Sequence, residues 1–124
     1  MRYGNELVLD LYGCKVKFTV ENVLRYFEHL CPLLNMKPYK VYFWSADELP
    51  SDQVPDIVEG MSAVQFILTS SITVHTSDKF NMIMINIFSC ANFDAQHAMN
   101  FSIDWFKASH CKHHFIERGV VDGR

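Results

Sequence analysis

Hydrophobic and polar residues alternate along several short segments of the chain, and elsewhere the hydrophobic residues recur at helical spacing. A period of two is typical of half-buried strands, and a period of 3.6 of amphipathic helices. The pattern predicts strands at residues 7–12, 39–44, 62–69, 72–76, 82–89 and 111–117. It predicts helices at residues 19–34 and 95–108, with Thr19 and Asp94 as N-terminal caps and Pro32 marking the end of the first helix.

Two segments of the chain are similar to each other. Leu9–Cys14 matches Ile85–Cys90 at an offset of 76 residues, and each is followed by a short loop, a helix and a strand. The similarity reflects either an internal repeat or chance likeness between two apolar strands. The element order predicts an α+β fold, a two-layer sandwich in which one mostly antiparallel sheet carries both helices on one face.

The length and composition suit one globular unit. The chain has 124 residues, of which 49% are hydrophobic and 20% charged, so residues 1–124 are expected to form a single domain. Residues 45–59 contain five acidic residues and two prolines, and we interpret them as an exposed loop. A domain of this size leaves apolar surface outside its core, which favours pairing with a second copy.

Charge and cysteine usage exclude several classes of function. The net charge is −3 and no basic stripe is present, which argues against a nucleic-acid partner. No apolar run is long enough to span a membrane, and the first residues lack the apolar stretch of a signal peptide, so we expect a cytoplasmic location. The cysteines (Cys14, Cys31, Cys90 and Cys111) form no C-x-x-C pair and are predicted to be thiols.

The candidate chemistry lies around residue 70. Ser62 precedes Ser70 by eight residues, His75 follows it by five and Cys90 follows it by twenty. Taken alone, each of these residues is more often structural, since serine pairs form turns and a cysteine that ends an apolar strand usually packs in the core.

Taken together, the residues resemble the prokaryotic type of S-adenosylmethionine decarboxylase. Leu9–Cys14 resembles the first strand of that family, Gly60–Val64 the segment that leads to its cleavage site, and Glu117–Gly119 its closing motif. Ser70, His75 and Cys90 fall at the family's processed serine, strand histidine and catalytic cysteine. Several separated residues in one register are more specific than any short motif.

The resemblance implies a pyruvoyl-dependent carboxy-lyase that processes itself between Thr69 and Ser70. The Ser70 hydroxyl would attack the Thr69 carbonyl carbon, and elimination and hydrolysis would leave a pyruvoyl group at the new N-terminus. Ser62 and His75 would carry protons during processing. The pyruvoyl ketone would form a Schiff base with the substrate amine, and Cys90 would return a proton to the α-carbon after CO2 leaves.

The implied substrate is S-adenosylmethionine, and the implied enzyme is a homodimer of cleaved protomers that serves polyamine (spermidine) synthesis. The chain differs from the family at several positions. Thr69 replaces a glutamate, Asn86 replaces an aspartate, and Ser77-Asp78-Lys79 replaces tryptophan-proline-glutamate. Two alternatives therefore stay open: a decarboxylase of arginine or ornithine, and an uncleaved, inactive paralogue that acts as a partner subunit.

Two further groups of residues are more simply explained by structural roles. The run His110–His114 invites comparison with a zinc site, but neighbouring side chains on a strand point to opposite faces, so no metal is expected. Trp44 is expected to pack in the core or in a dimer interface, with stacking on adenine as the alternative.

Overall fold

Within the residues that the structure describes, the chain forms one sheet and two helices in the order that the sequence predicts. The structure is a computed structural model that describes residues 1–45 and 59–121, so nearly all of the predicted acidic loop lies outside the described residues. The elements are β1 (Gly4–Tyr12), α1 (Val20–Leu33), β2 (Pro38–Ser45), β3 (Met61–Ile67), β4 (Ser70–Ser77), β5 (Met82–Ser89), α2 (Ala95–Phe106) and β6 (His110–Arg118).

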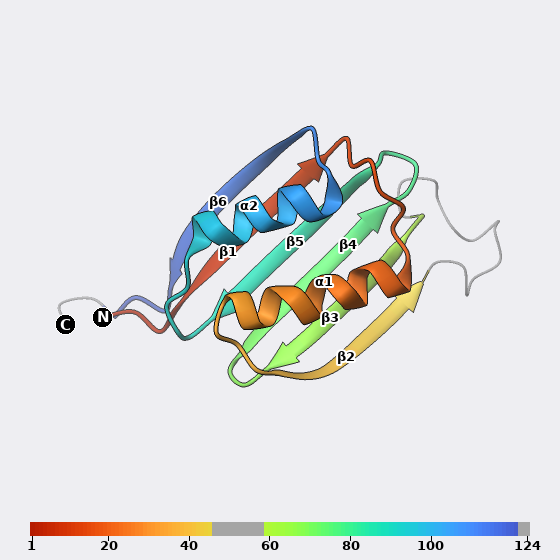
Figure 1. The fold of residues 1–124 in the computed structure, drawn as a ribbon. Helices are drawn as coiled ribbons and strands as arrows, with labels where there is room; N and C mark the ends of the chain where they lie inside the picture. Colours follow the sequence, from red (N-terminus) through yellow and green to blue (C-terminus); the bar gives the residue numbers. More distant parts are fainter. Residues whose placement is uncertain (46–58, 122–124) are drawn as a thin grey trace.

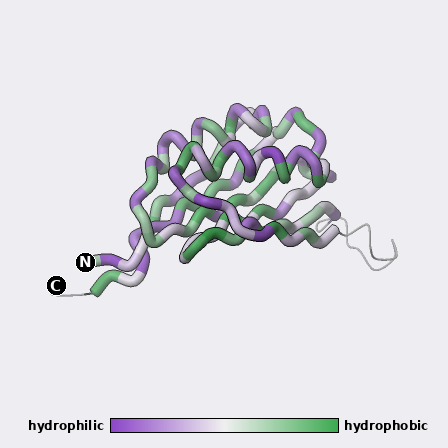
Figure 2. The backbone as a smooth tube through the Cα atoms, turned by 60° about the horizontal axis from the view of Figure 1, so that its bottom comes forward, coloured by the Kyte–Doolittle hydropathy of each residue, from purple (hydrophilic) through white to green (hydrophobic). Residues whose placement is uncertain are grey.

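The sheet has six strands in the order β2-β3-β4-β5-β1-β6, and every neighbouring pair is antiparallel. Both helices lie side by side across one face of this sheet (Figure 1). Figure 2 shows the two layers, with the helices on one side and a bare sheet surface on the other. The predicted α+β two-layer sandwich is therefore confirmed.

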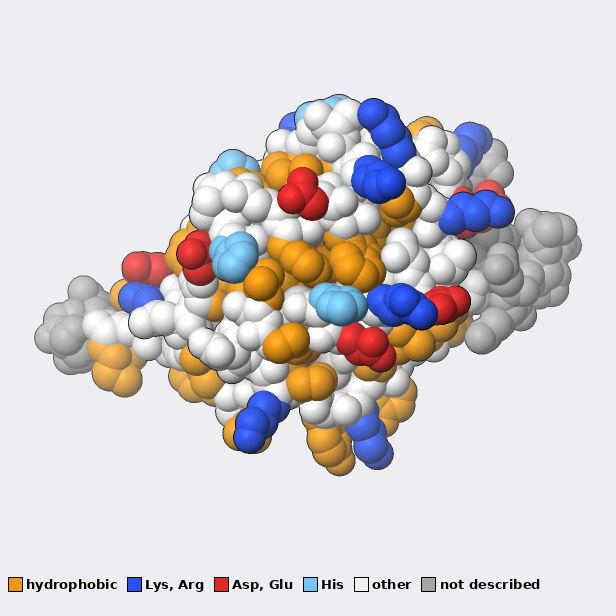
Figure 3. Space-filling view, viewed as in Figure 1, with side chains coloured by type: hydrophobic (Ala, Val, Ile, Leu, Met, Phe, Trp, Pro, Cys, Tyr) orange, Lys and Arg blue, Asp and Glu red, His pale blue; other side chains and the backbone are white. Residues whose placement is uncertain are grey.

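The core lies between the helices and the sheet. Alternate residues of the central strands, such as Ile83, Ile85 and Ile87 of β5, are fully buried against the helical layer. The largest buried side chain, Tyr26 of α1, packs among aromatic rings, and its hydroxyl lies 2.7 Å from Ser102 Oγ of α2. From the helix side, Figure 3 shows apolar side chains gathered between the helices and charged side chains around them.

The other face of the sheet, which we call the open face, carries no helix in the described part of the chain. Directly opposite residues on antiparallel strands place their side chains on the same face. The strand register therefore defines three rows on the open face: Trp44, Ser62, His75, Met84, Asp10 and Lys112; Tyr42, Val64, Thr73, Asn86, Val8 and His114; and Phe66, Ser71, Phe88, Glu6 and Ile116. These rows mix aromatic and aliphatic side chains with polar ones, and the charged Asp10, Lys112 and Glu6 lie on β1 and β6.

The two similar segments become β1 and β5, which are adjacent and place Leu9 opposite Ile85. Each strand is followed by a helix and a further strand, as the sequence indicates. The strands after the helices take different places, because β6 lies beside β1 whereas β2 lies at the far edge of the sheet. The likeness therefore extends to the order of elements but not to the placement of every strand.

One predicted boundary is wrong and the others hold closely. The first helix ends within one residue of the prediction, because α1 continues to Leu33 with Pro32 in its last turn. The strand predicted to reach Thr69 ends at Ile67, since Leu68 and Thr69 form a turn and β4 begins at Ser70. A β-branched threonine favours a strand in sequence terms, but the antiparallel pairing of β3 with β4 requires a reversal at this point.

Candidate active site

The turn between β3 and β4 holds Thr69 in an unfavourable backbone conformation. Ile67 pairs with Ser70, so Leu68 and Thr69 form a two-residue connection. Thr69 has φ 55°, in the left-handed region. A β-branched side chain there crowds the backbone, and such residues cost about 1–3 kcal/mol unless the surroundings enforce them. The bond between Thr69 and Ser70 therefore follows a strained residue.

Ser70 is the first residue of β4 and lies opposite Ser89, the last residue of β5. The Ser70 hydroxyl donates a hydrogen bond of 2.9 Å to Ser89 Oγ, which also accepts one of 3.1 Å from the Ala91 backbone N–H. Because Ser89 is only 1% exposed, the Ser70 hydroxyl is held against a buried and fixed partner.

Cys90 lies beside the same bond. Its Sγ is 2.7 Å from Thr69 Oγ1, and the Thr69 hydroxyl donates its own proton to the Leu68 carbonyl at 2.6 Å. The Cys90 thiol therefore lies in contact with the residue that precedes Ser70. A Cβ on Gly4 of β1 would lie 2.4 Å from the Ser89 carbonyl oxygen and 3.1 Å from Cys90 Cα, so glycine lets β1 approach the end of β5.

The serine and histidine predicted to assist processing form a pair elsewhere. Ser62 of β3 lies directly opposite His75 of β4, and Ser62 Oγ is 2.8 Å from His75 Nδ1. The pair borders a cavity of about 300 Å³ whose lining includes Trp44 and Met84. This pair is on the open face of the sheet.

Within one chain the predicted residues thus form two separate groups. Thr69, Ser70 and Cys90 come together at one end of β4, and Ser62 meets His75 toward the other end. Because His75 follows Ser70 by five residues, the two side chains point to opposite faces and lie about 16 Å apart along the strand. Figure 1 shows the β3–β4 turn and the end of β5 at the same end of the sheet.

Sequence reasoning missed two features of this site. Ser89 had no signal of its own, because its contact with Ser70 depends on the register of β4 against β5. The second feature is a groove of about 780 Å³ beside the Leu68–Thr69 turn. Aromatic side chains and two lysines, Lys37 and Lys40, line this groove, so the turn is open to small molecules.

The residues that differ from the family have identifiable surroundings. Asn86 donates a hydrogen bond to Glu6 Oε2, and Arg118 binds the other carboxylate oxygen of Glu6. An aspartate at position 86 would face the Glu6 carboxylate and repel it. Lys79 is exposed in the β4–β5 turn, with its amine 5.8 Å from the centre of the Phe80 ring.

All four cysteines are free thiols, as predicted. Burial raises the pKa of Cys14 to about 11 and likewise the pKa of Cys31 to about 11. Cys14, the counterpart of Cys90 in the similar segment, is buried and donates to the Leu11 carbonyl oxygen at 3.7 Å, which fits packing.

The histidine-rich strand β6 alternates as expected, with Cys111 and His113 opposite Leu11 and Leu9 of β1. Among residues 1–45 and 59–121, no three His, Cys, Asp or Glu side chains gather as metal ligands. In the same ranges no helix has the length and apolar character needed to cross a membrane.

Fold and site together define a small α+β protein with a serine–cysteine site at the end of its sheet. The sequence profile of S-adenosylmethionine decarboxylase matches residues 5–119, and the chain belongs to this family. This confirms the resemblance that the sequence motifs indicate.

A solved structure has the same fold. The crystal structure of the adenosylmethionine decarboxylase from Aquifex aeolicus VF5 superimposes with a TM-score of 0.78 and 19% sequence identity, covering 99% of this chain and 96% of that chain. No curated protein sequence matches the chain significantly.

Proposed function

We propose that the chain is a self-processing, pyruvoyl-dependent decarboxylase of S-adenosylmethionine that serves polyamine synthesis. The observation that carries this proposal is the arrangement at the β3–β4 turn, where strained Thr69 directly precedes Ser70 and the Cys90 thiol contacts Thr69. Family membership supports decarboxylation. Neither the family match nor the fold favours an arginine or ornithine decarboxylase or an inactive partner subunit.

Processing begins with transfer of the Thr69 acyl group from the Ser70 nitrogen to the Ser70 side-chain oxygen. Ser70 Oγ bonds to the Thr69 carbonyl carbon, the bond from that carbon to the Ser70 nitrogen breaks, and the hydroxyl proton ends on the freed nitrogen. Loss of the Ser70 α-proton then expels the Thr69 carboxylate, and water replaces the nitrogen as ammonia to give the ketone. Elimination breaks the last bond between Thr69 and residue 70, so relief of the backbone strain at Thr69 would favour the cleaved products.

The proton transfers need an imidazole, and His75 of the same chain is about 16 Å away along the strand. We propose that a second copy supplies the Ser62–His75 pair. In each copy the Ser62–His75 pair lies in one outer row of the open face. Phe88 lies in the other outer row, and Cys90 follows two residues later, beyond that row. A two-fold axis near the middle row would exchange the two ends, so each His75 would approach the end of the other copy's β4, where the Thr69–Ser70 bond lies.

The residues at the turn also suit the mature enzyme. A pyruvoyl group supplies an electrophilic ketone that stabilises negative charge when CO2 leaves an amino acid. Residue 70 would stay in place after cleavage, because β4 remains paired with β3 and β5. The exposed Cys90 thiol, which lies beside the turn, would deliver the proton to the substrate α-carbon.

The test is intact-mass analysis of the purified protein. Self-processing predicts two fragments, residues 1–69 and 70–124, the second without a free amine. Ser70→Ala should stay whole, whereas Ser71→Ala, which removes the neighbouring hydroxyl, should still be cleaved. A wild-type chain that stays whole after long incubation would contradict the proposal.

Substrate and proton donor are tested on the cleaved protein. Release of CO2 from S-adenosylmethionine should exceed release from arginine and ornithine. Cys90→Ala should reduce that release strongly without blocking cleavage, because its role follows processing. Faster CO2 release from arginine or ornithine would show that the proposed substrate is wrong. Full activity of Cys90→Ala would show that the thiol is not the proton donor.

A further inference from the structure

We infer that Ser89, supported by Asn5, is a positioning residue that fixes the Ser70 hydroxyl for attack on its own upstream carbonyl. The inference rests on the proposed self-cleavage and adds residues to it. Ser89 does not act as the base, since a neutral hydroxyl accepts a hydrogen bond but does not retain the proton.

Ser89 belongs to a polar row that packing alone does not explain. Ser70, Ser89 and Asn5 occupy directly opposite positions on β4, β5 and β1. They lie on the helix-covered face, where the next residues inward, Ile72 and Ile87, are fully buried. Burying polar groups at the end of such a face costs free energy unless they bind one another.

The hydrogen bonds of Ser89 restrict its rotation. Its Oγ accepts from the Ser70 hydroxyl at 2.9 Å and from the Ala91 backbone N–H at 3.1 Å. Because Ser89 Oγ already accepts two hydrogen bonds, its own hydroxyl proton must point toward a third group. The backbone donor fixes where Ser89 Oγ lies, and Ser89 thereby fixes where Ser70 Oγ lies.

Asn5 offers the acceptor that this proton needs. Asn5 is 2% exposed, and its Oδ1 is the one buried side-chain oxygen or nitrogen without a hydrogen-bond partner among the described residues. Its amide nitrogen is already engaged, because it donates to Asn92 Oδ1 at 3.3 Å. Because Asn5 lies directly opposite Ser89, a shift of the Asn5 side chain toward Ser89 would complete a chain of hydrogen bonds from Ser70 through Ser89 to Asn5. Such a chain polarises the Ser70 hydroxyl.

The experiment compares rates of self-cleavage by intact mass. Ser89→Ala should slow cleavage about tenfold, the effect of losing one positioning hydrogen bond. Ser89→Thr keeps the hydroxyl and should cleave at nearly the wild-type rate. Asn5→Asp keeps the acceptor and should retain most of the rate, whereas Asn5→Leu should lose part of it.

Ser102→Ala is the matched control for a structural effect. Ser102 is also a fully buried serine, and its hydroxyl binds Tyr26 and the Ala98 carbonyl, remote from the turn. This variant should lower the melting temperature at least as much as Ser89→Ala while cleaving at the wild-type rate.

Each outcome decides between the two proposals. If the wild type cleaves and Ser89→Ala cleaves equally fast, the positioning role is wrong and self-processing stands. If the rates of Ser89→Ala and Ser102→Ala fall together with their melting temperatures, the effect is structural and the positioning role is again wrong. A wild-type chain that never cleaves would overturn both proposals.

Discussion

Thr69 is the residue at which local strain and proposed chemistry coincide. Glycine adopts a φ of 55° freely, so Thr69→Gly should relieve the strain. In a Ser70→Ala background, which prevents cleavage, we expect Thr69→Gly to raise the free energy of unfolding by about 1 kcal/mol. With Ser70 present, the same change should slow self-cleavage. Thermal or denaturant unfolding and intact mass measure the two effects.

Leu68 provides the control at the turn. It is 84% exposed and is not among the residues with positive φ, so Leu68→Gly should lower stability slightly through backbone entropy. If Thr69→Gly lowers stability as Leu68→Gly does, strain at Thr69 does not drive the reaction.

The buried thiols give the protein a dependence on alkaline pH. Burial raises the pKa of Cys14 from 9.0 to about 11, so the folded state keeps this proton where the unfolded state loses it. Cys31 has the same shift and the same cause. Since the native state then binds more protons than the unfolded state, the free energy of unfolding should fall between pH 9 and 11. Denaturant unfolding across this range measures the slope, which Cys14→Ala should reduce. An unchanged slope in Cys14→Ala would contradict the assignment.

At the scale of elements, the sequence alone predicts the residues that cap the N-termini of α1 and α2. Asp94 Oδ1 accepts from the His97 backbone N–H at 3.0 Å, and Thr19 Oγ1 accepts from the Asn22 backbone N–H at 3.0 Å. We expect Asp94→Ala and Thr19→Ala each to cost about 1 kcal/mol of stability, measured by denaturant unfolding. Asp94→Asn, which keeps the accepting oxygen, should cost much less.

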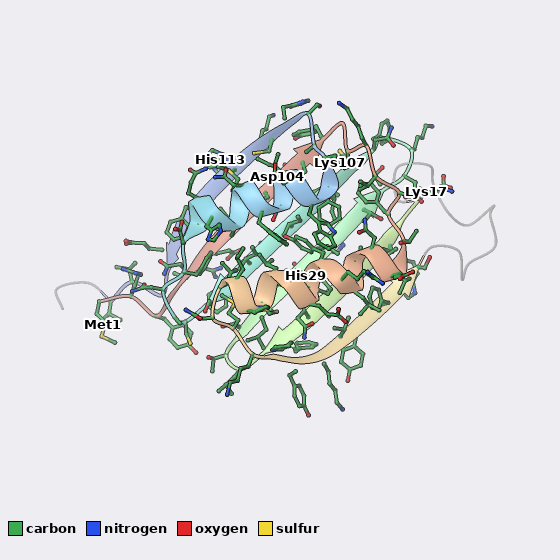
Figure 4. The ribbon with its side chains drawn as sticks, viewed as in Figure 1. Met1, Lys17, His29, Asp104, Lys107 and His113 are labelled. Carbon is green, nitrogen blue, oxygen red and sulfur yellow. The ribbon has the colours of Figure 1, made fainter. Side chains whose placement is uncertain are left out.

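Asp104 is the control for loss of a charge. It lies on the exposed side of α2 and is labelled in Figure 4. Asp104→Ala should leave stability nearly unchanged. If it costs as much as Asp94→Ala, the effect at position 94 is not capping.

The elements were predictable because hydrophobic spacing and caps are local properties. The six strands and two helices of the described residues follow from periods of two and 3.6, and the largest error lies at Thr69, where the strand reversal overrides local preference. The contact of Ser70 with Ser89 needed the register of two strands, which depends on the whole sheet. The family resemblance gives His75 a role in processing Ser70, but an odd separation on one strand puts the two side chains of one chain on opposite faces.

At the scale of the molecule, the helices cover one face of the sheet, and the apolar side chains on the other face need an explanation. The open face carries aromatic and aliphatic side chains, including Trp44 at 48% exposure and Phe66 at 45%. Apolar area of this kind is typical of an interface, and a second copy would cover it with a like surface. The open face and the separation of His75 from Ser70 therefore support the same assembly.

The assembly predicts complementation between two inactive variants. Ser70→Ala keeps His75 but has no hydroxyl to attack, and His75→Ala keeps Ser70 but lacks the imidazole, so each alone should stay whole. When differently tagged copies are co-expressed, a mixed pair contains one complete site. In that pair only the His75→Ala chain should be cleaved, and with random pairing roughly half of those chains would have such a partner. Intact mass of each tagged chain gives the result. Cleavage of His75→Ala on its own would exclude a required imidazole, and a mixture that stays whole despite forming mixed pairs would show that the second copy does not supply it.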